Sequence, residues 1–310
     1  MLKYMIKRIL FIIPSVFIVS VLTFVVLSLS PGTPGQAALG INATQEQIDA
    51  FNHSVGYDRP LPERYIDYMA GALQGDFGES YTQHNDVAAI LIPKFPTTLT
   101  VAFLAVLFSA AIGIPIGVLA ALKKGTAVDV GTTTVALVFA SIPSFWLGLM
   151  LMLLFSLKLG ILPSHGIGTW KNLVLPVATL ALPSAAYVAR MVRITMLDEF
   201  NQDYVRTARA KGASENRIVF IHVIRNAMMP VLTNLGMSFA GLLGGAIIAE
   251  QVFGLPGFGS AILNAINMKD TPIVLGATLF LSFTYMIIML VLDLVNALLN
   301  PKFRDSIEKA

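Results

Sequence analysis

The residue types that carry catalysis or bind metals occur in this chain, but none stands at a spacing typical of such a site. There is no cysteine, which excludes disulfides and thiolate metal sites. No Gly-Lys pair of a Walker A loop and no G-x-S-x-G elbow occurs. The histidines never form the H-E-x-x-H pattern of a zinc helix, and they are scattered: His53, His84, His165 and His222. We expect no catalytic residue, no metal ligand and no cofactor on this chain.

Residues 203–230, DYVRTARAKGASENRIVFIHVIRNAMMP, form the longest charged segment between two apolar runs on the side that the charge distribution predicts to be cytoplasmic. Good helix formers predict a short helix over Tyr204–Lys211, with Asp203 as its N-cap. Gly212 follows basic residues, as a glycine that ends a helix in the left-handed conformation does. A second helix is predicted over Glu215–Arg225. Two helices that meet at a glycine form a rigid elbow.

The strings YVRTARAKGAS and HVIRNAMMPVLT in this segment resemble the coupling-loop ("EAA") motif of ABC importer permeases, in the dipeptide/oligopeptide/nickel branch. Arg206-Thr207-Ala208 occupy the positions of the Glu-Ala-Ala triplet, so its glutamate is missing, and Gly212 occupies the position of the motif glycine. The alternative is a basic loop that only sets topology. The resemblance implies contact with an ATPase subunit by Tyr204, Arg206, Thr207, Ala208, Arg209, Lys211, Gly212 and Arg217.

The composition indicates the environment in which this elbow must be held. Charged residues make up 13% of the 310 residues, about half the usual globular share, and the mean hydropathy is +0.74. The chain is therefore an all-α polytopic membrane protein. Its net charge of +3 is no argument for binding to nucleic acid, which we do not expect.

Six apolar runs are long enough to cross a bilayer, which takes about 20 helical residues. They are Ile9–Ser30, Phe95–Leu122, Val130–Leu157, Asn172–Ala189, Asn226–Ala249 and Thr271–Leu292. The fourth contains Pro176 and Pro183, where we expect a kink and not a break. With the N-terminus inside, fifteen of the 21 lysines and arginines fall in inner segments. This bias predicts that both termini are cytoplasmic.

The long outer segment, residues 31–94, is predicted to contain short amphipathic helices. Thr44-x-x-Gln47 is a capping-box pattern that opens a helix toward His53, and Pro62 stands where the next helix begins. The strings PGTPG, GYDRPLPERY, QGDFGESY, VFGLPGFG and LLNPKFR resemble the same permease branch at corresponding places. The resemblance thus covers nearly the whole chain.

Within the third run, Ser141, Pro143 and Ser144 combine two hydroxyls with a helix breaker. A proline frees backbone carbonyls that can line a translocation path. A simple packing kink explains the same residues equally well.

The resemblance implies a type I importer fold with a first span at 1–30, an extracytoplasmic segment at 31–94, and a five-span core at 95–310 that carries the coupling loop. It also implies an assembly in a prokaryotic cell membrane. The partners would be a paralogous second permease, two ATPase subunits that hold ATP and Mg, and an extracytoplasmic binding protein.

The implied substrate is a small peptide, with a nickel complex or glutathione as alternatives in the same branch. A self-sufficient secondary transporter or channel is the competing class. Such a protein would carry ionisable groups at membrane depth, and Asp293 is the one weak candidate.

Overall fold

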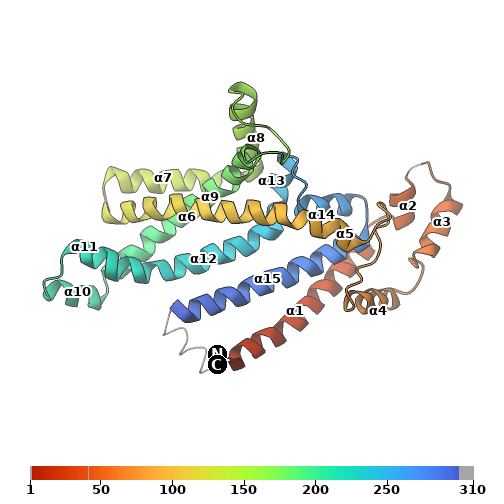
Figure 1. Cartoon of the computed structure of the whole chain (residues 1–310), viewed down its shortest axis with the longest axis horizontal. Helices are drawn as coiled ribbons and strands as arrows, with labels where there is room; N and C mark the ends of the chain where they lie inside the picture. The colour runs from red at the N-terminus through yellow and green to blue at the C-terminus, as the bar shows by residue number, and fades with distance from the viewer. Residues whose placement is uncertain (1, 41, 300–310) are drawn as a thin grey trace. The chain divides into compact units, whose positions relative to one another are not determined.

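The computed structural model describes residues 2–40 and 42–299, and its regular elements are helices (Figure 1). The chain divides into two compact units. The elbow unit comprises Leu99–Leu255 and the residues from Ile288 on, and the N-terminal unit comprises Leu2–Thr98 and Pro256–Ile287. The predicted outer segment, 31–94, lies entirely within the N-terminal unit.

The N-terminal unit begins with the long helix α1 (Leu2–Leu29). Short helices follow, and α15 is shared with the elbow unit: α2 (Pro34–Leu39), α3 (Gln45–Ser54), α4 (Leu61–Ala72), α5 (Val87–Leu91), the 3₁₀ turn η1 (Ile92–Lys94), α14 (Phe258–Asn267) and α15 (Thr271–Leu299). Thr44 and Gln47 form the predicted capping box at the start of α3, and Pro62 lies in the first turn of α4. Both sequence predictions are confirmed.

The remaining helices belong to the elbow unit, apart from residues 95–98 at the start of α6. They are α6 (Phe95–Leu122), α7 (Ala127–Ser141), α8 (Ser144–Leu151), the π-helical η2 (Met152–Lys158), α9 (Lys171–Phe200), α10 (Asp203–Ala210), α11 (Glu215–Arg217), the π-helical η3 (Ile218–Val223), α12 (Ile224–Gly245) and α13 (Ile247–Val252). Helix α9 packs against α7, α8 and α12, so it is the centre of this unit (Figure 1). It runs unbroken through Pro176 and Pro183, as predicted, but continues past Ala189 to Phe200.

The described residues contain four helices long and apolar enough to cross a membrane. A fifth span is possible if α7 and the α8–η2 helix, which meet at an angle of 100°, are one broken span. A shorter apolar helix over Ile13–Leu29 lies within α1, in the region of the first of the six predicted spans, Ile9–Ser30. The six-span count therefore stays a prediction. The cytoplasmic C-terminus also stays one, because residues 300–310 lie outside the described residues.

Two glycines one turn apart bring α6 against α9. A Cβ added to Gly113 would stand 2.6 Å from the carbonyl oxygen of Ala185, and one added to Gly117 would stand 2.5 Å from that of Ala189. This small-xxx-small spacing is the usual way in which membrane helices bring their backbones together. Val188 and Val192 fill the space beside the glycines and are buried.

Candidate functional site

The elbow predicted from residues 203–230 is present, and Gly212 is its corner. Gly212 has φ +80° and follows Lys211, the C-cap of α10. Its N–H donates to the carbonyl of Arg209 (2.9 Å), and the N–H of Ala213 donates to the carbonyl of Ala208 (3.1 Å). These two bonds are the Schellman arrangement that satisfies the last carbonyls of a helix. The glycine prediction is confirmed in its geometry.

An ion pair joins the two arms of the elbow across this corner. The Nε and Nη2 atoms of Arg209 donate to the two carboxylate oxygens of Glu215, at 2.8 and 3.1 Å. The pair is exposed to solvent, and it raises the pKa of Arg209 above its usual value. The bidentate geometry fixes the angle between α10 and α11 more than it adds stability.

Apolar side chains on the inner face of the elbow anchor it to α9. Val205 of α10 and Ile218 of η3 are fully buried in one cluster with Val192 and Met196 of α9. The Tyr204 hydroxyl donates to Glu199 at 2.5 Å, and burial raises the pKa of this tyrosine, which keeps it protonated. The elbow is thus attached to the last turns of the central helix.

The predicted coupling residues separate into two sets. Tyr204 and Ala208 pack against the apolar cluster, so they position the elbow and do not form its outer surface. The remaining predicted residues are exposed together on the outside: Arg206, Thr207, Arg209, Lys211, Gly212 and Arg217. Four of these six are cationic. This set is a basic, solvent-facing surface for a partner.

Two details of the predicted elbow are wrong. The N-cap of α10 is Gln202, and Asp203 is already helical, with Arg206 near it in an exposed ion pair. The second helix does not stop at Arg225. It continues from α11 through η3 into α12, so residues Glu215–Gly244 form one helical span. Asn226 gives no stop signal, and Pro230 is accommodated inside α12.

Two features of the elbow were not found from the sequence. Glu215 does lie in the first turn of α11, as predicted, but its ion pair with Arg209, six residues away on the other arm, is not predicted. Phe220 and Ile221 on η3 are 65% and 53% exposed, and they present an apolar face next to the basic surface. The sequence alone does not distinguish these exposed residues, because the same apolar run after Arg217 also contains Ile218 and Val219, which are buried.

The three residues predicted for a translocation path lie where α7 and α8 meet. Pro143 precedes α8, and Ile142 is extended, with φ −80° and ψ 124°, so the chain breaks here and does not merely kink. Ser141 and Pro143 are exposed and Ser144 is half-buried. The Ser141 hydroxyl donates to the Leu137 carbonyl at 2.9 Å.

A buried ion pair ties α7 to α9. Arg193 donates to both carboxylate oxygens of Asp129, and the Asp129 side chain is 6% exposed. The same carboxylate accepts the N–H of Gly125 at 3.0 Å, which closes the α6–α7 turn. Among the described residues, no group of three or more histidines and carboxylates could hold a metal ion.

Comparison with known proteins matches nearly the whole chain to one family of membrane components. Residues 113–305 match the family described as binding-protein-dependent transport system inner membrane component, and residues 1–102 match the N-terminal module of such membrane components. The glutathione transport system permease protein GsiC of Escherichia coli (strain K12) is 38% identical over 304 residues, which cover 98% of this chain and 99% of that protein. GsiC of Shigella dysenteriae serotype 1 (strain Sd197) gives the same figures.

Solved structures share the fold. The chain matches a subunit of the inward-facing MetNI methionine ABC transporter with a TM-score of 0.54 and 20% identity, covering 68% of this chain and 96% of that one. The crystal structure of an amino acid ABC transporter with histidines matches with a TM-score of 0.51 and 22% identity. The match covers 67% of this chain and 94% of that one. The chain therefore belongs to the family of binding-protein-dependent transport system inner membrane components, the translocating permease subunits of ABC importers, which are not themselves enzymes.

Proposed function

We propose that this chain is one of two paralogous permease subunits of an importer for short peptides, driven by ATP hydrolysis on partner chains. The family implies an ATPase and a substrate-binding protein as partners. The observation that carries the peptide assignment is the end-to-end match to permeases whose name states glutathione transport. Glutathione is a γ-linked tripeptide, so a site for it handles amide and carboxylate groups. Two ATPase subunits would hold ATP and Mg.

The elbow would be the contact with one ATPase subunit. Its outer face offers four cations, at 206, 209, 211 and 217, beside the apolar Phe220 and Ile221. Charged and apolar groups side by side favour an oriented protein contact. The helix from Glu215 continues into α12, so a displacement of the elbow would reach a membrane-spanning helix through one continuous element.

The break between α7 and α8 would border the translocation path. Ser141, Pro143 and Ser144 supply hydroxyls and an interrupted backbone there, and polar groups at membrane depth are tolerated where they face water or protein. Substitution of Ser144 by Ala would then change the preference among substrates without loss of ATP hydrolysis.

Reconstitution of the complex in liposomes tests the function. Uptake of a labelled dipeptide should require ATP, the binding protein and both permeases. Competition by glutathione and by nickel–histidine complexes ranks the two alternative substrates. ATP-independent uptake by this chain alone would contradict the proposal and support a secondary transporter. Transport of nickel complexes with no transport of peptides would contradict the peptide assignment alone.

A further inference from the structure

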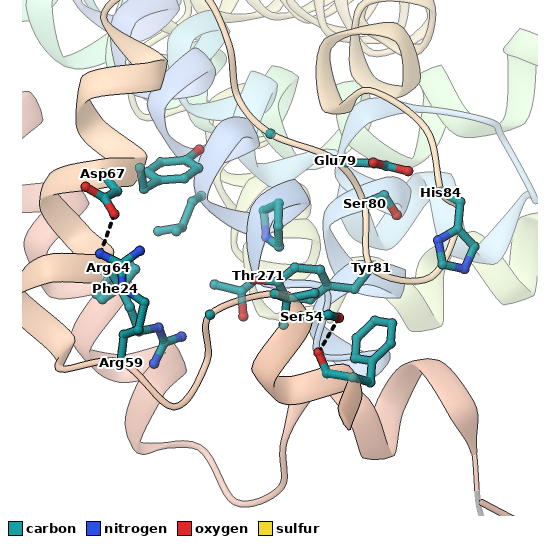
Figure 2. Close-up of a pocket in the computed structure, with 17 residues that line it drawn as sticks. Phe24, Ser54, Arg59, Arg64, Asp67, Glu79, Ser80, Tyr81, His84 and Thr271 are labelled. Carbon is teal, nitrogen blue, oxygen red and sulfur yellow. Dashed lines mark hydrogen bonds and ion pairs between the residues drawn. The ribbon is translucent and has the colours of Figure 1, made fainter. Parts of the chain in front are cut away.

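A cavity of about 470 Å³ lies in the N-terminal unit, outside the elbow and the α7–α8 break (Figure 2). Its walls come from α1, α3, α4, the loop at 78–84 and the first turns of α15. The volume is within the range of sites that bind small molecules. Both aromatic and charged side chains line it, and Figure 2 labels Phe24, Arg64, Glu79 and Tyr81 among them.

Arg64 is the cation of this cavity that is available to a ligand. Its guanidinium lies 4.2 Å from the ring centroid of Tyr57 and 5.6 Å from that of Phe24. Among the described residues, no carboxylate pairs with it. The second arginine in the wall, Arg59, is already paired with Asp67 at 2.7 Å. A guanidinium held flat by aromatic rings keeps its donors in the plane that suits a carboxylate.

Glu79 supplies the opposite charge on the other side of the cavity. Figure 2 shows Glu79 and His84 on one side, and the two arginines and Asp67 on the other. The Glu79 side chain has no hydrogen bond or ion pair in the described part of the chain. Since Arg59 and Asp67 cancel, the remaining charged side chains of the wall are Arg64 and Glu79, which come from opposite sides of the cavity.

One residue of the wall, Tyr68, also has a polar atom without a partner among the described residues. The Tyr68 hydroxyl is buried and has no hydrogen-bond partner among the described residues. A buried hydroxyl without a partner is destabilising, so an acceptor on a ligand or a water would relieve it. Burial raises the pKa of Tyr68 and of Tyr81, which leaves both phenols protonated and able to donate.

The wall at 78–84 is fixed, so the cavity is preformed. Asp270 is fully buried and accepts hydrogen bonds from the Ser80 hydroxyl (2.6 Å), the Thr82 hydroxyl (2.7 Å) and the backbone N–H groups of Tyr81 and Thr82. The loop that carries Glu79 and Tyr81 is thus attached to the start of α15.

We propose that this cavity binds a short zwitterionic peptide, whose carboxylate pairs with Arg64 and whose ammonium group pairs with Glu79. The assignment to a peptide deepens the proposed function, because it gives the cargo a binding site on the permease itself. The aromatic walls at Phe24, Phe51 and Tyr81 accept the ligand's apolar side chains, and the two charges set its direction in the cavity.

The test is binding of labelled dialanine to the purified full complex in nanodiscs, without the binding protein. The probes are dialanine, N-acetyl-dialanine, which lacks the ammonium group, and dialanine amide, which lacks the carboxylate. Wild type should prefer dialanine to each blocked probe by about tenfold, which corresponds to about 1.4 kcal/mol. Glu79→Gln should abolish the preference over N-acetyl-dialanine only. Arg64→Lys, which keeps the charge but loses the planar fork, should reduce the preference over dialanine amide only.

Glu46→Gln is the matched control, because Glu46 is an exposed carboxylate on α3 that does not line the cavity. It should bind all three probes as wild type does. Equal binding of the three probes by wild type would overturn the proposal, as would loss of all binding in Glu46→Gln. Binding of glycerophosphoethanolamine in place of dialanine would show a lipid headgroup site and would also overturn it.

Uptake assays separate this inference from the proposed function. Uptake of dialanine through the wild-type complex with its binding protein, combined with no charge-dependent binding here, would overturn this site and leave the importer assignment intact. Charge-dependent binding of dialanine without its uptake would leave this site intact and contradict the peptide as cargo.

Discussion

The chain turns at the elbow and before α15 with the same Schellman cap. The polar groups beside the cap face solvent at the elbow and the protein interior before α15. At the elbow the residue after the C-cap is Gly212, and it is exposed. After α14 it is Lys269, with φ +53°, whose N–H donates to the Ile266 carbonyl while that of Asp270 donates to the Ala265 carbonyl. The elbow directs its polar groups outward. The second cap places Asp270 in the interior, where it holds the loop at 80–82.

The two regions derive their rigidity from different interactions. The elbow is anchored by apolar contacts with α9, and its charged side chains, including the exposed pairs Arg209–Glu215 and Arg206–Asp203, remain on the outer surface. The cap before α15 is held by charge-assisted hydrogen bonds within the chain, so its polar groups are already used. A substitution in the first region should therefore affect coupling before stability, and one in the second should affect stability first.

The largest effect is expected at Asp270. Asp270→Ala removes the acceptor of four donors, and each buried donor left without a partner costs about 1–3 kcal/mol. We expect a loss of about 3 kcal/mol or more, visible as a lower thermal midpoint and as faster amide exchange at Tyr81 and Thr82. Asp86→Ala, which removes only the N-cap bond to Ala89, is the control and should cost about 1 kcal/mol. Equal losses in the two variants would contradict a special role for Asp270.

The next effect is expected at Gly212. A Cβ at this position would meet nothing within 4 Å. Gly212→Val therefore destabilises the fold only through the strain of a left-handed backbone at a residue other than glycine, about 1–2 kcal/mol. We expect normal insertion into the membrane but loss of uptake, either because the ATPases no longer bind or because they hydrolyse ATP without transport. Gly212→Ala should be milder, and Gly212→Asn milder still, since asparagine tolerates this conformation. Full uptake by the valine variant at equal subunit stoichiometry would show that the elbow is not the coupling device.

A smaller effect of opposite sign is expected at Lys269. Glycine adopts a positive φ freely, so Lys269→Gly should raise the thermal midpoint by an amount equivalent to at most about 1 kcal/mol. The lysine side chain also lies against Gly32, and loss of that contact will offset part of the gain. Lys269→Ala, which loses the same contact but keeps a Cβ, is the control. A midpoint for Lys269→Gly no higher than that of Lys269→Ala would contradict backbone strain at this cap.

The smallest effect is expected at the exposed pair of His53 and Asp58, which lie 2.7 Å apart. The hydrogen bond and charge of Asp58 raise the pKa of His53 above its ordinary value near 6.5. The pair therefore stabilises the end of α3 fully below that value, and the contribution disappears as the pH rises through the raised pKa. An NMR titration should show the His53 pKa returning to its ordinary value in Asp58→Asn. An unchanged pKa would contradict the pairing.

Local sequence signals predicted the corner of the elbow and the start of α3, but not the cap before α15. Gly212 after basic residues and Thr44 three positions before Gln47 each act within one helical turn, so the sequence alone locates them. The end of the second elbow helix was predicted wrongly because Asn226 and Pro230 mark no boundary once neighbouring helices support the backbone.

Contacts between distant parts of the chain were not predictable. Asp270 meets Ser80 across 190 positions, and Arg193 meets Asp129 across 64. In the sequence each is a charge near the end of an apolar run, with nothing beside it that identifies its partner. Its partner is decided by how the helices pack, which no local pattern of residue types encodes. The cavity around Arg64 and Glu79 was missed for the same reason.

The close approach of α6 and α9 limits how the elbow unit can deform. With Gly113 and Gly117 against the carbonyls of Ala185 and Ala189, a shift by even one residue, about 1.5 Å, would bring the side chains that flank the glycines against these carbonyls. Helices α6 and α9 therefore cannot slide past one another, so they move together. Because α9 ends at Phe200, shortly before α10 begins at Asp203, a displacement of the elbow would move α6 and α9 together as one rigid body.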